Sequence, residues 1–411
     1  MTSERWEWLR GQMPVTRDYA YMNSGWSGPI SIPVVDAMKQ RLELELEHGP
    51  TTRAVMDDRI ALGERFRELQ ARILNASPSE ISITGNTTEG VNIAVNGLDY
   101  GPDDEVVVST SEHGSGMVPA YYLRERHGVG VQIAQVHGKQ SPGEALEAYA
   151  SVIGAHTKLV IISEISYSTG QLLPLKEIVT AAHRHGARVL VDGAQTAGHI
   201  PIDVRASEVD YYAVPSHKWL CGPDGLGALY VREDLIPTLA PVKVSGRAAA
   251  SYDFEGNFAP EREKITKYEL TTISPALLAG TNAAADIYLE SGAQAVFDRA
   301  RELNRYAEQR FEGIDRVTVT SPEDEGSRTG LFLFSVEGEE PQRVTAYLQQ
   351  QAKVVCRTVA QFNSVRLSLH CFNTEGEIDR AAETVERAIR EGIPDDVTPA
   401  TAFEARADRM T

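Results

Sequence analysis

The sequence has few cysteines, a shortage of positive charge and no long apolar run. Its three cysteines, Cys221, Cys356 and Cys371, are an odd and widely spaced set. They predict neither a disulfide framework nor a zinc site, and they favour a reducing compartment, the cytoplasm. Lys and Arg number 40 against 58 Asp and Glu, a formal net charge of −18. A field of this sign repels phosphate backbones and anionic lipids, so neither nucleic acid nor a membrane is an expected partner.

No stretch approaches the roughly 18 apolar residues of a membrane-spanning helix. The first eight residues, MTSERWEW, also lack the apolar segment of a secretory signal. What is present is a balance of 42% hydrophobic and 24% charged residues over 411 positions. This composition is typical of a folded chain with a core, and the length suits two domains.

Short β-rich runs alternate with helical stretches through the middle of the chain. The runs with strand character are 81–84, 105–109, 131–136, 158–165, 188–192, 209–214 and 226–231. Because they are apolar throughout and joined by helices, they predict an α/β fold with a mostly parallel central sheet covered on both faces. Ligands bind such sheets at the carboxyl ends of the strands, so polar residues at those ends are candidate site residues.

The pattern changes after about residue 280, where helices and short strands predict a small α+β domain. The expected division is an N-terminal helical segment at 1–20, a large domain at 21–280, a small C-terminal domain at 281–392 and a polar tail at 393–411. We expect the N-terminal segment to complete the small domain.

Two strand ends carry an acid and a lysine. Asp192 ends an apolar strand, where a carboxylate is costly unless a donor or cation meets it; a helix N-cap would also place an aspartate there. Lys218 follows another strand beside Trp219 and Leu220. Desolvation by these neighbours would lower the pKa of the amine and make it nucleophilic, although most lysines are solvated surface charges.

Two further strand ends carry hydroxyls and a histidine. The segment 85–90, GNTTEG, lies between a strand and a helix. It offers hydroxyls and N-terminal amides that suit a phosphate, or an ordinary capping box. His113 follows the strand 105–109, and a lone histidine is more often structural than catalytic. Together the four features suit pyridoxal phosphate (PLP), which needs a Schiff-base lysine, an acid at its pyridine nitrogen and anion-binding amides.

On these residues the chain resembles the class V aminotransferase family of fold type I PLP enzymes. The resemblance runs from Tyr21 to about Arg390 and is most specific at VDGAQ, 191–195, and at His217–Lys218. Within that family the chain is similar to the cysteine/cystine C–S lyases at 168–175, 209–213 and 217–223. The implied fold is a mostly parallel sheet with helices on both faces and a small C-terminal α+β domain.

The resemblance implies a role for each matching residue. Lys218 would form the Schiff base and then move the proton at the substrate α-carbon. Asp192 would pair with the protonated pyridine nitrogen, and Gln195 would hydrogen-bond the phenolate oxygen of the cofactor. His113 would stack on the ring face.

The resemblance also implies how the phosphate is held. The implied contacts come from Thr87, Thr88, His217 and, across the subunit interface of a homodimer, Thr272. The family usually has a hydroxyl residue where this chain has Pro215. Either Ser216 takes over that contact, or the contact is lost.

Arg366 matches the arginine that clamps the substrate carboxylate, for which a guanidinium offers two parallel hydrogen bonds. Arg357 is a possible second guanidinium, which binds a distal acid group or pairs with a surface carboxylate. Tyr21, Asn23 and Trp26 are expected to line the mouth of the substrate site. No metal site is predicted.

One departure from the family bears on the reaction. Cysteine desulfurases carry a nucleophilic cysteine on a loop before the clamp arginine, and the segment 357–364, RTVAQFNS, contains none. Cys356 precedes this segment in an apolar run and is interpreted as a buried small hydrophobe. Tyr167 stands where desulfurases carry an asparagine. Persulfide chemistry on a cysteine of the enzyme is therefore not expected.

The expected function is PLP-dependent removal of an amino-acid α-proton followed by β-elimination, as in the C–S lyases. An aminotransferase or an isopenicillin-N-epimerase-like racemase is the alternative, since both share the deprotonation step. A cysteine desulfurase and a non-catalytic PLP-binding protein are less favoured, the first for want of the loop cysteine.

Overall fold

The structure is a computed structural model that describes residues 3–397, and most of the tail expected at 393–411 lies outside the described residues. The helices are α1 (Ser3–Gly11), α2 (Ile32–His48), α3 (Arg53–Leu74), α4 (Thr87–Asn96), α5 (Gly114–His127), α6 (Pro142–Ala150), α7 (Leu175–Arg184), α8 (Val204–Ser207), α9 (Pro275–Ser291), α10 (Ala293–Phe311), α11 (Pro341–Ala352) and α12 (Glu375–Glu391). The strands are β1 (Ala20–Tyr21), β2 (Ile81–Thr84), β3 (Glu105–Ser109), β4 (Gly130–Ala134), β5 (Thr157–Ser163), β6 (Arg188–Asp192), β7 (Tyr211–Pro215), β8 (Gly227–Val231), β9 (Ala249–Tyr252), β10 (Phe258–Pro260), β11 (Val317–Val319), β12 (Leu331–Val336), β13 (Val354–Val355), β14 (Arg357–Val359) and β15 (Ser364–Ser368).

The central sheet confirms the predicted α/β fold. Its strand order is β2-β8-β7-β6-β5-β3-β4, and β8 runs antiparallel to both of its neighbours. The connection from β7 to β8 spans only residues 216–226, which is too short for the crossover that a parallel pair requires. The remaining strands share one direction, so β2, β5, β6 and β7 all end at the same edge.

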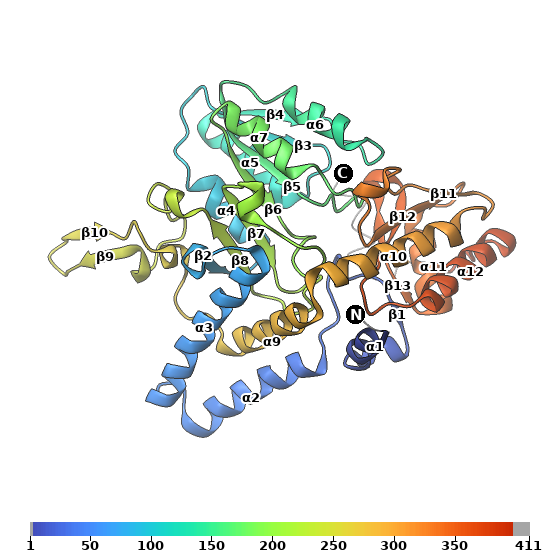
Figure 1. The fold of residues 1–411 in the computed structure, drawn as a ribbon, viewed down its shortest axis with the longest axis horizontal. Helices are drawn as coiled ribbons and strands as arrows, with labels where there is room; N and C mark the ends of the chain where they lie inside the picture. Colours follow the sequence, from blue (N-terminus) through green and yellow to red (C-terminus); the bar gives the residue numbers. More distant parts are fainter. Residues whose placement is uncertain (1–2, 398–411) are drawn as a thin grey trace.

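Successive residues of the buried strands enter two different hydrophobic clusters. In β6, for example, Leu190 packs on the face covered by α4 and α5, whereas Val189 and Val191 face α3, α6, α7 and α9 (Figure 1). This alternation is the period-2 geometry of a strand. It explains why these runs are apolar throughout: both faces of the sheet are covered.

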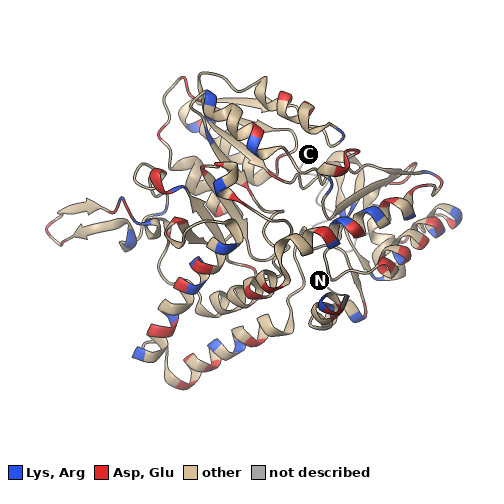
Figure 2. Cartoon of the chain, in the orientation of Figure 1, with Lys and Arg blue, Asp and Glu red and all other residues tan. Residues whose placement is uncertain are grey.

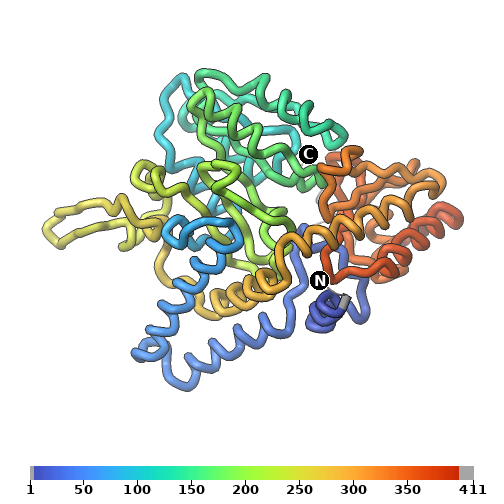
Figure 3. Tube along the Cα trace, viewed as in Figure 1, coloured from blue at the N-terminus to red at the C-terminus, as the bar shows by residue number. Residues whose placement is uncertain are grey.

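A separate hydrophobic cluster lies in the C-terminal third, among α10, α11, α12 and the antiparallel sheet β11-β12-β15-β14. Ala20 and Met22 from the N-terminal segment belong to it, and β1 pairs in parallel with β13. The blue N-terminal trace accordingly lies beside the orange and red C-terminal part (Figure 3). The division expected at residue 280 stays a prediction, because α9 runs through that position as one helix.

A hairpin and a pair of helices project from the body of the molecule. The hairpin β9–β10 extends as an arm with Tyr252, Phe254 and Phe258 exposed (Figure 1). The α2–α3 helix pair projects beside it. Charged residues of both signs are interspersed along α2, α3, α10 and α12 (Figure 2). Among the described residues no helix combines the length and apolarity needed to cross a bilayer.

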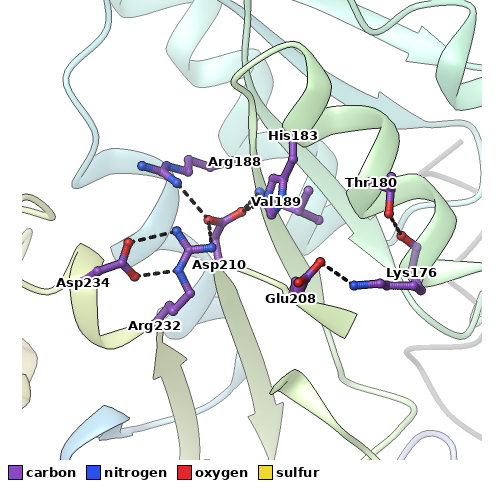
Figure 4. A network of polar contacts seen from close by, with 9 residues as sticks. All are labelled: Lys176, Thr180, His183, Arg188, Val189, Glu208, Asp210, Arg232 and Asp234. Carbon is purple, nitrogen blue, oxygen red and sulfur yellow. Dashed lines mark hydrogen bonds and ion pairs between the residues drawn. The ribbon is translucent and has the colours of Figure 1, made fainter. Parts of the chain in front are cut away.

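Asp210 ties strand ends together at the edge of the sheet opposite the carboxyl ends of β6 and β7. Its side chain is fully buried and accepts hydrogen bonds from Val189 N at 2.7 Å, His183 Nε2 at 2.8 Å and Arg188 Nη1 at 3.2 Å (Figure 4). Arg232 Nη1 lies 3.0 Å from the same carboxylate. A buried carboxylate is costly unless donors meet it, and here the donors also tie other segments to the start of β7.

We expect Asp210→Asn to lower the free energy of unfolding by about 2–3 kcal/mol, because the amide replaces an acceptor oxygen by a donor that faces other donors. Glu208→Gln is the matched control, since it removes the exposed ion pair with Lys176 on the same side of the sheet (Figure 4). That change should cost much less than the change at Asp210, because water and salt screen an exposed ion pair. Urea denaturation followed by circular dichroism measures both. Equal effects of the two substitutions would contradict the role given to Asp210.

Candidate active site

The polar strand ends converge on one cavity at the carboxyl edge of the central sheet. Its empty volume is about 310 Å³. The residues that line it are His113, Ser163, Ile165, Tyr167, Asp192, Ala194, Gln195, Lys218 and Arg357. Five residues singled out from the sequence are therefore brought together, from the ends of β3, β6 and β7 and from β14.

Asp192 lies at the centre of this edge. It is 3% exposed, and in the sheet register it stands between Ser163 of β5 and Ala213 of β7. Its Oδ1 accepts a hydrogen bond from Ala194 N at 2.9 Å. The next helix, α8, begins only at Val204, so Asp192 is not a helix N-cap. Its carboxylate closes a turn and lines the cavity.

Lys218 follows β7, the strand next to β6, and lines the same cavity. Burial lowers the pKa of Lys218 to about 8; Asp192 opposes this shift, and the cations Arg366 and Arg357 add to it. The segment that carries Lys218 is fixed by a hydrogen bond from Gly28 N to the His217 carbonyl at 2.7 Å. An amine with this pKa is partly neutral near pH 8 and can act as a nucleophile.

His113 caps the start of α5. Its Nδ1 accepts a hydrogen bond from Ser115 N at 3.1 Å, and its ring meets that of Tyr167 edge-on, with centroids 5.1 Å apart. Burial, and then the charge of Lys218, lower the pKa of His113. The capping bond requires an unprotonated Nδ1, so the ring is neutral with its proton on Nε2.

Glu112 is a buried acid that the sequence placed beside His113 without a role. It accepts hydrogen bonds from Ser163 N at 2.9 Å, Ser163 Oγ at 2.6 Å, Ser109 Oγ at 3.1 Å and Tyr149 Oη at 3.3 Å. Burial raises its pKa to about 7, although the bonds from Ser163 oppose the shift. Glu112 thus joins β3 to β5 beneath the cavity.

The start of α4 has the groups needed to hold a phosphate. Asn86 caps the helix by accepting from Glu89 N at 2.9 Å, and the first amides of a helix have no carbonyl partner within it. Thr87 Oγ1 and His217 Nδ1 are both buried without a hydrogen-bond partner among the described residues. Thr88 Oγ1 lies 2.9 Å from Ser115 Oγ. Orphaned polar atoms at these positions fit an anionic group.

Ser216 is the residue that would replace the hydroxyl absent at Pro215. Its hydroxyl is 1% exposed and donates to the Pro223 carbonyl at 2.5 Å, with the Leu226 carbonyl 3.0 Å away. A hydroxyl has one hydrogen to donate, and here it closes the loop between β7 and β8. Neither of these bonds reaches the start of α4, and the replacement of the hydroxyl absent at Pro215 by Ser216 stays a prediction.

Arg366 is a buried cation with unused hydrogen-bond donors. It is 0% exposed, and its Nη1 donates to the Tyr167 carbonyl at 2.7 Å. Its Nε and Nη2 have no hydrogen-bond partner among the described residues. Burial, and then the neighbouring Arg357, lower the pKa of Arg366 to about 9. An unpaired buried guanidinium is costly, so this geometry favours the arrival of an anion.

Glycine at position 25 leaves room beside this guanidinium. A Cβ on Gly25 would lie 2.8 Å from Ser368 Oγ and 3.1 Å from Arg366 Nη2. Ser368 Oγ and Asn23 Oδ1 are also buried without partners among the described residues. Several unsatisfied polar atoms therefore surround the free edge of Arg366.

Arg357 stands opposite Arg366 in the β14–β15 register, and its guanidinium carbon lies 4.8 Å above the ring of Trp26. Tyr21 Oη instead donates to the Ser27 carbonyl at 2.8 Å. The guanidinium of Arg357 thus rests on the Trp26 ring beside the cavity. The phenol of Tyr21 stabilises the turn that contains Ser27. The expected role of Tyr21, Asn23 and Trp26 at the substrate mouth stays a prediction.

Thr272 is not brought to the cavity of its own chain. It is exposed, has a φ of 66° and lines a different cleft with an empty volume of about 1110 Å³. In that cleft the buried Glu269 is paired with Arg67 at 2.6 Å and with Arg247 at 3.0 Å. The expected phosphate contact from a partner subunit stays a prediction.

All three cysteines are buried, including Cys356, which was expected to be buried from its apolar run. Burial raises the pKa of Cys221 to about 12 and that of Cys371 well above its usual value. The turn between β14 and β15 carries Gln361, which donates to the Thr110 carbonyl at 2.8 Å and accepts from Tyr167 Oη at 3.1 Å. In the part of the chain that the structure describes, no group of three or more His, Cys, Asp or Glu side chains is placed to hold a metal ion.

The fold and this site define a PLP-dependent enzyme of fold type I. The profile of the family described as "Aminotransferase class-V" matches residues 23–381, and the chain belongs to that family. Lys218, Asp192 and the orphaned groups at Thr87 and His217 are the residues that fit the cofactor.

The relatives carry two different names. A "Probable cysteine desulfurase" from Methanothermobacter thermautotrophicus is 30% identical over 399 residues, which cover 93% of this chain and 98% of the relative. A "Cysteine desulfurase" from Escherichia coli strain SE11 is 30% identical over 346 residues, 80% of this chain and 82% of the relative.

Solved structures support the fold and the cofactor. The cystine C–S lyase C-DES, in complex with its reaction product cysteine persulfide, superposes with a TM-score of 0.85 at 28% identity and covers 91% of this chain and 99% of its own. A mutant of C-DES with glycine covalently linked to its PLP cofactor has the same TM-score and identity, over 92% of this chain and 98% of its own.

Proposed function

We propose that this enzyme removes the α-proton of an amino acid and expels a β-substituent, with sulfur as the leaving atom, as a C–S lyase does. The observation that carries the proposal is the pairing of a buried, donor-rich Arg366 with an adjacent cavity that contains Lys218 but no thiol. The guanidinium supports an amino-acid substrate, and the missing thiol supports elimination over persulfide transfer.

Arg366 fixes the substrate by its carboxylate. The Nε and Nη2 edge is unpaired and presents two parallel donors, which match the two oxygens of a carboxylate. Binding an anion there also compensates a buried charge that otherwise has only the Tyr167 carbonyl at Nη1. The unpaired guanidinium raises the free energy of the ligand-free protein, and binding of a carboxylate removes that penalty.

Lys218 moves the proton at the substrate α-carbon. PLP, when bound, supplies the electron sink that makes this carbon acidic. The depressed pKa of Lys218, about 8, leaves a fraction of the amine unprotonated and able to act as a base at neutral pH. Asp192 would hold a proton on the pyridine nitrogen of the bound cofactor, and the neutral ring of His113 would lie against the cofactor ring.

The cysteines support elimination over desulfuration. Transfer of sulfur to the protein needs an accessible thiolate. Burial raises the pKa of Cys221 to about 12, and none of the cysteines lines the cavity beside Lys218. The β14–β15 turn, where desulfurases carry their nucleophile, instead holds Gln361 in two hydrogen bonds.

A homodimer is part of the proposal. Apolar side chains are exposed on the projecting helix pair and on the hairpin arm, namely Leu42, Leu46, Met56, Ile60, Tyr252, Phe254 and Phe258. Exposed apolar residues in projecting elements are typical of a subunit interface. Thr272, exposed beside them, would then reach the phosphate group of the neighbouring subunit.

The test is to incubate the purified holoenzyme with L-cystine and with L-cysteine and to identify the products by mass. Elimination from cystine with uptake of water gives pyruvate, ammonia and cysteine persulfide. Alanine from cysteine would instead establish desulfuration, the second candidate, which the names of the sequence relatives favour. A 2-oxo acid that forms only with an amino acceptor would indicate transamination, and appearance of the D-amino acid would indicate racemisation.

A further inference from the structure

Trp219, which directly follows the Schiff-base lysine, holds a residue of the cavity wall. Its side chain is 1% exposed, and its indole Nε1 donates to Gln195 Oε1 at 2.8 Å. At the other end of the same amide, Gln195 Nε2 donates to the Gly25 carbonyl at 2.8 Å. Gln195 is itself 3% exposed and lines the cavity with Lys218 and Asp192.

These two partners fix which way round the amide stands. An indole N–H can only donate and a backbone carbonyl can only accept, so each independently assigns oxygen to one end of Gln195 and nitrogen to the other. The amide oxygen is then occupied by Trp219. The second hydrogen of Nε2 remains available to the cavity.

Trp219 is itself held rigidly. His199 stacks on its ring with centroids 3.6 Å apart and planes 10° apart, and His370 Nε2 donates to the Trp219 carbonyl at 2.8 Å. His199 is in turn bonded to the Gln195 carbonyl at 2.9 Å and accepts from Gly330 N at 2.8 Å. Burial lowers the pKa of His199 to about 3 and that of His370 to about 4, so both rings are neutral and the stack does not change with pH near neutrality.

We propose that Trp219 is a positioning residue, which orients the Gln195 amide so that its N–H group, and not its oxygen, faces the phenolate oxygen of PLP. The inference rests on PLP being bound at Lys218. A donor at the phenolate oxygen competes with the hydrogen bond that the protonated Schiff-base nitrogen makes to the same oxygen. It therefore keeps the pKa of that nitrogen low, and losing it raises that pKa.

The test is a pH titration of the visible absorbance of the bound cofactor in Trp219→Phe, which keeps an aromatic ring in the stack but has no N–H. We expect the midpoint to rise by about one pH unit, a tenfold change in the protonation equilibrium. Trp8→Phe is the matched control, because Trp8 is an exposed tryptophan of α1. Its midpoint should equal that of the wild type.

A second titration separates positioning from packing. In a Gln195→Ala background the Trp219→Phe change should add no further shift, because the group that Trp219 orients is gone. An additive shift there, or an unchanged midpoint in Trp219→Phe alone, would overturn the proposal. If Trp219→Phe does not fold, site-specific replacement of Trp219 by 3-benzothienylalanine removes only the N–H and gives the same comparison. A wild-type protein without a visible band would overturn the PLP assignment itself.

Discussion

Lys218→Ala should abolish the visible absorbance of the cofactor and lower turnover by about 10⁴-fold, because one amine provides both the covalent link and the base. Non-covalent affinity for PLP should survive in part. Asp192, His113 and the groups at the start of α4 are untouched by the change, and in the proposed function they would supply the contacts to the ring and the phosphate. Absorbance spectra and equilibrium dialysis against PLP measure the two effects separately.

Lys176→Ala is the control for this experiment. Lys176 is an exposed lysine paired with Glu208 (Figure 4), and it is not among the residues that line the cavity. Its removal should leave the spectrum and the turnover unchanged. A Lys218→Ala protein with the wild-type chromophore would show that a different amine holds the cofactor.

Arg366→Met should move activity and stability in opposite directions. The kcat/KM for an amino-acid substrate should fall by about 10³-fold, since a buried charge-assisted pair contributes roughly 3–5 kcal/mol when one partner is removed. The free energy of unfolding should instead rise by about 1–2 kcal/mol. The methionine replaces a buried guanidinium whose Nε and Nη2 are unpaired, and so removes a cost of folding.

The substrate supplies one control for Arg366, and Arg357 supplies the other. A substrate analogue with an amide in place of the carboxylate should react equally poorly with the wild type and with Arg366→Met. Arg357→Met should have a smaller effect on the simplest amino acids, because Arg357 rests on Trp26 at the edge of the cavity. Chemical denaturation and steady-state kinetics together decide the matter: loss of both activity and stability in Arg366→Met would assign the arginine a structural role instead.

The sequence was sufficient to find the centre of the site. Asp192 and Lys218 each follow an apolar strand, and parallel strands bring their carboxyl ends to one edge, so the topology rule alone placed them together. Ser216 shows that adjacency along the chain does not determine which way a side chain points. It precedes His217 and Lys218, but its hydroxyl turns towards the carbonyls of Pro223 and Leu226, which only the folded loop brings near.

The features that the sequence could not supply depend on segments far apart in the chain. The bond from Trp219 to Gln195, and that from Gln195 to Gly25, join three separate loops. Nothing in the local sequence around Trp219, Gln195 or Gly25 predicts these bonds. The apolar pattern of 226–231 predicts a strand but not its direction. The antiparallel direction of β8 follows from the shortness of the loop between β7 and β8.

The pairing of β1 with β13 sets a delay during synthesis. Ala20 and its partner Val354 are about 330 residues apart in the chain. At a ribosomal rate of roughly 5–20 residues per second, the first strand waits about 20 to 70 s before its neighbour exists. During that interval Ala20 and Met22, which are both fully buried in the finished fold, have no apolar surroundings. The segment around β1 is therefore the part of the nascent chain that a ribosome-bound chaperone would protect most effectively from aggregation.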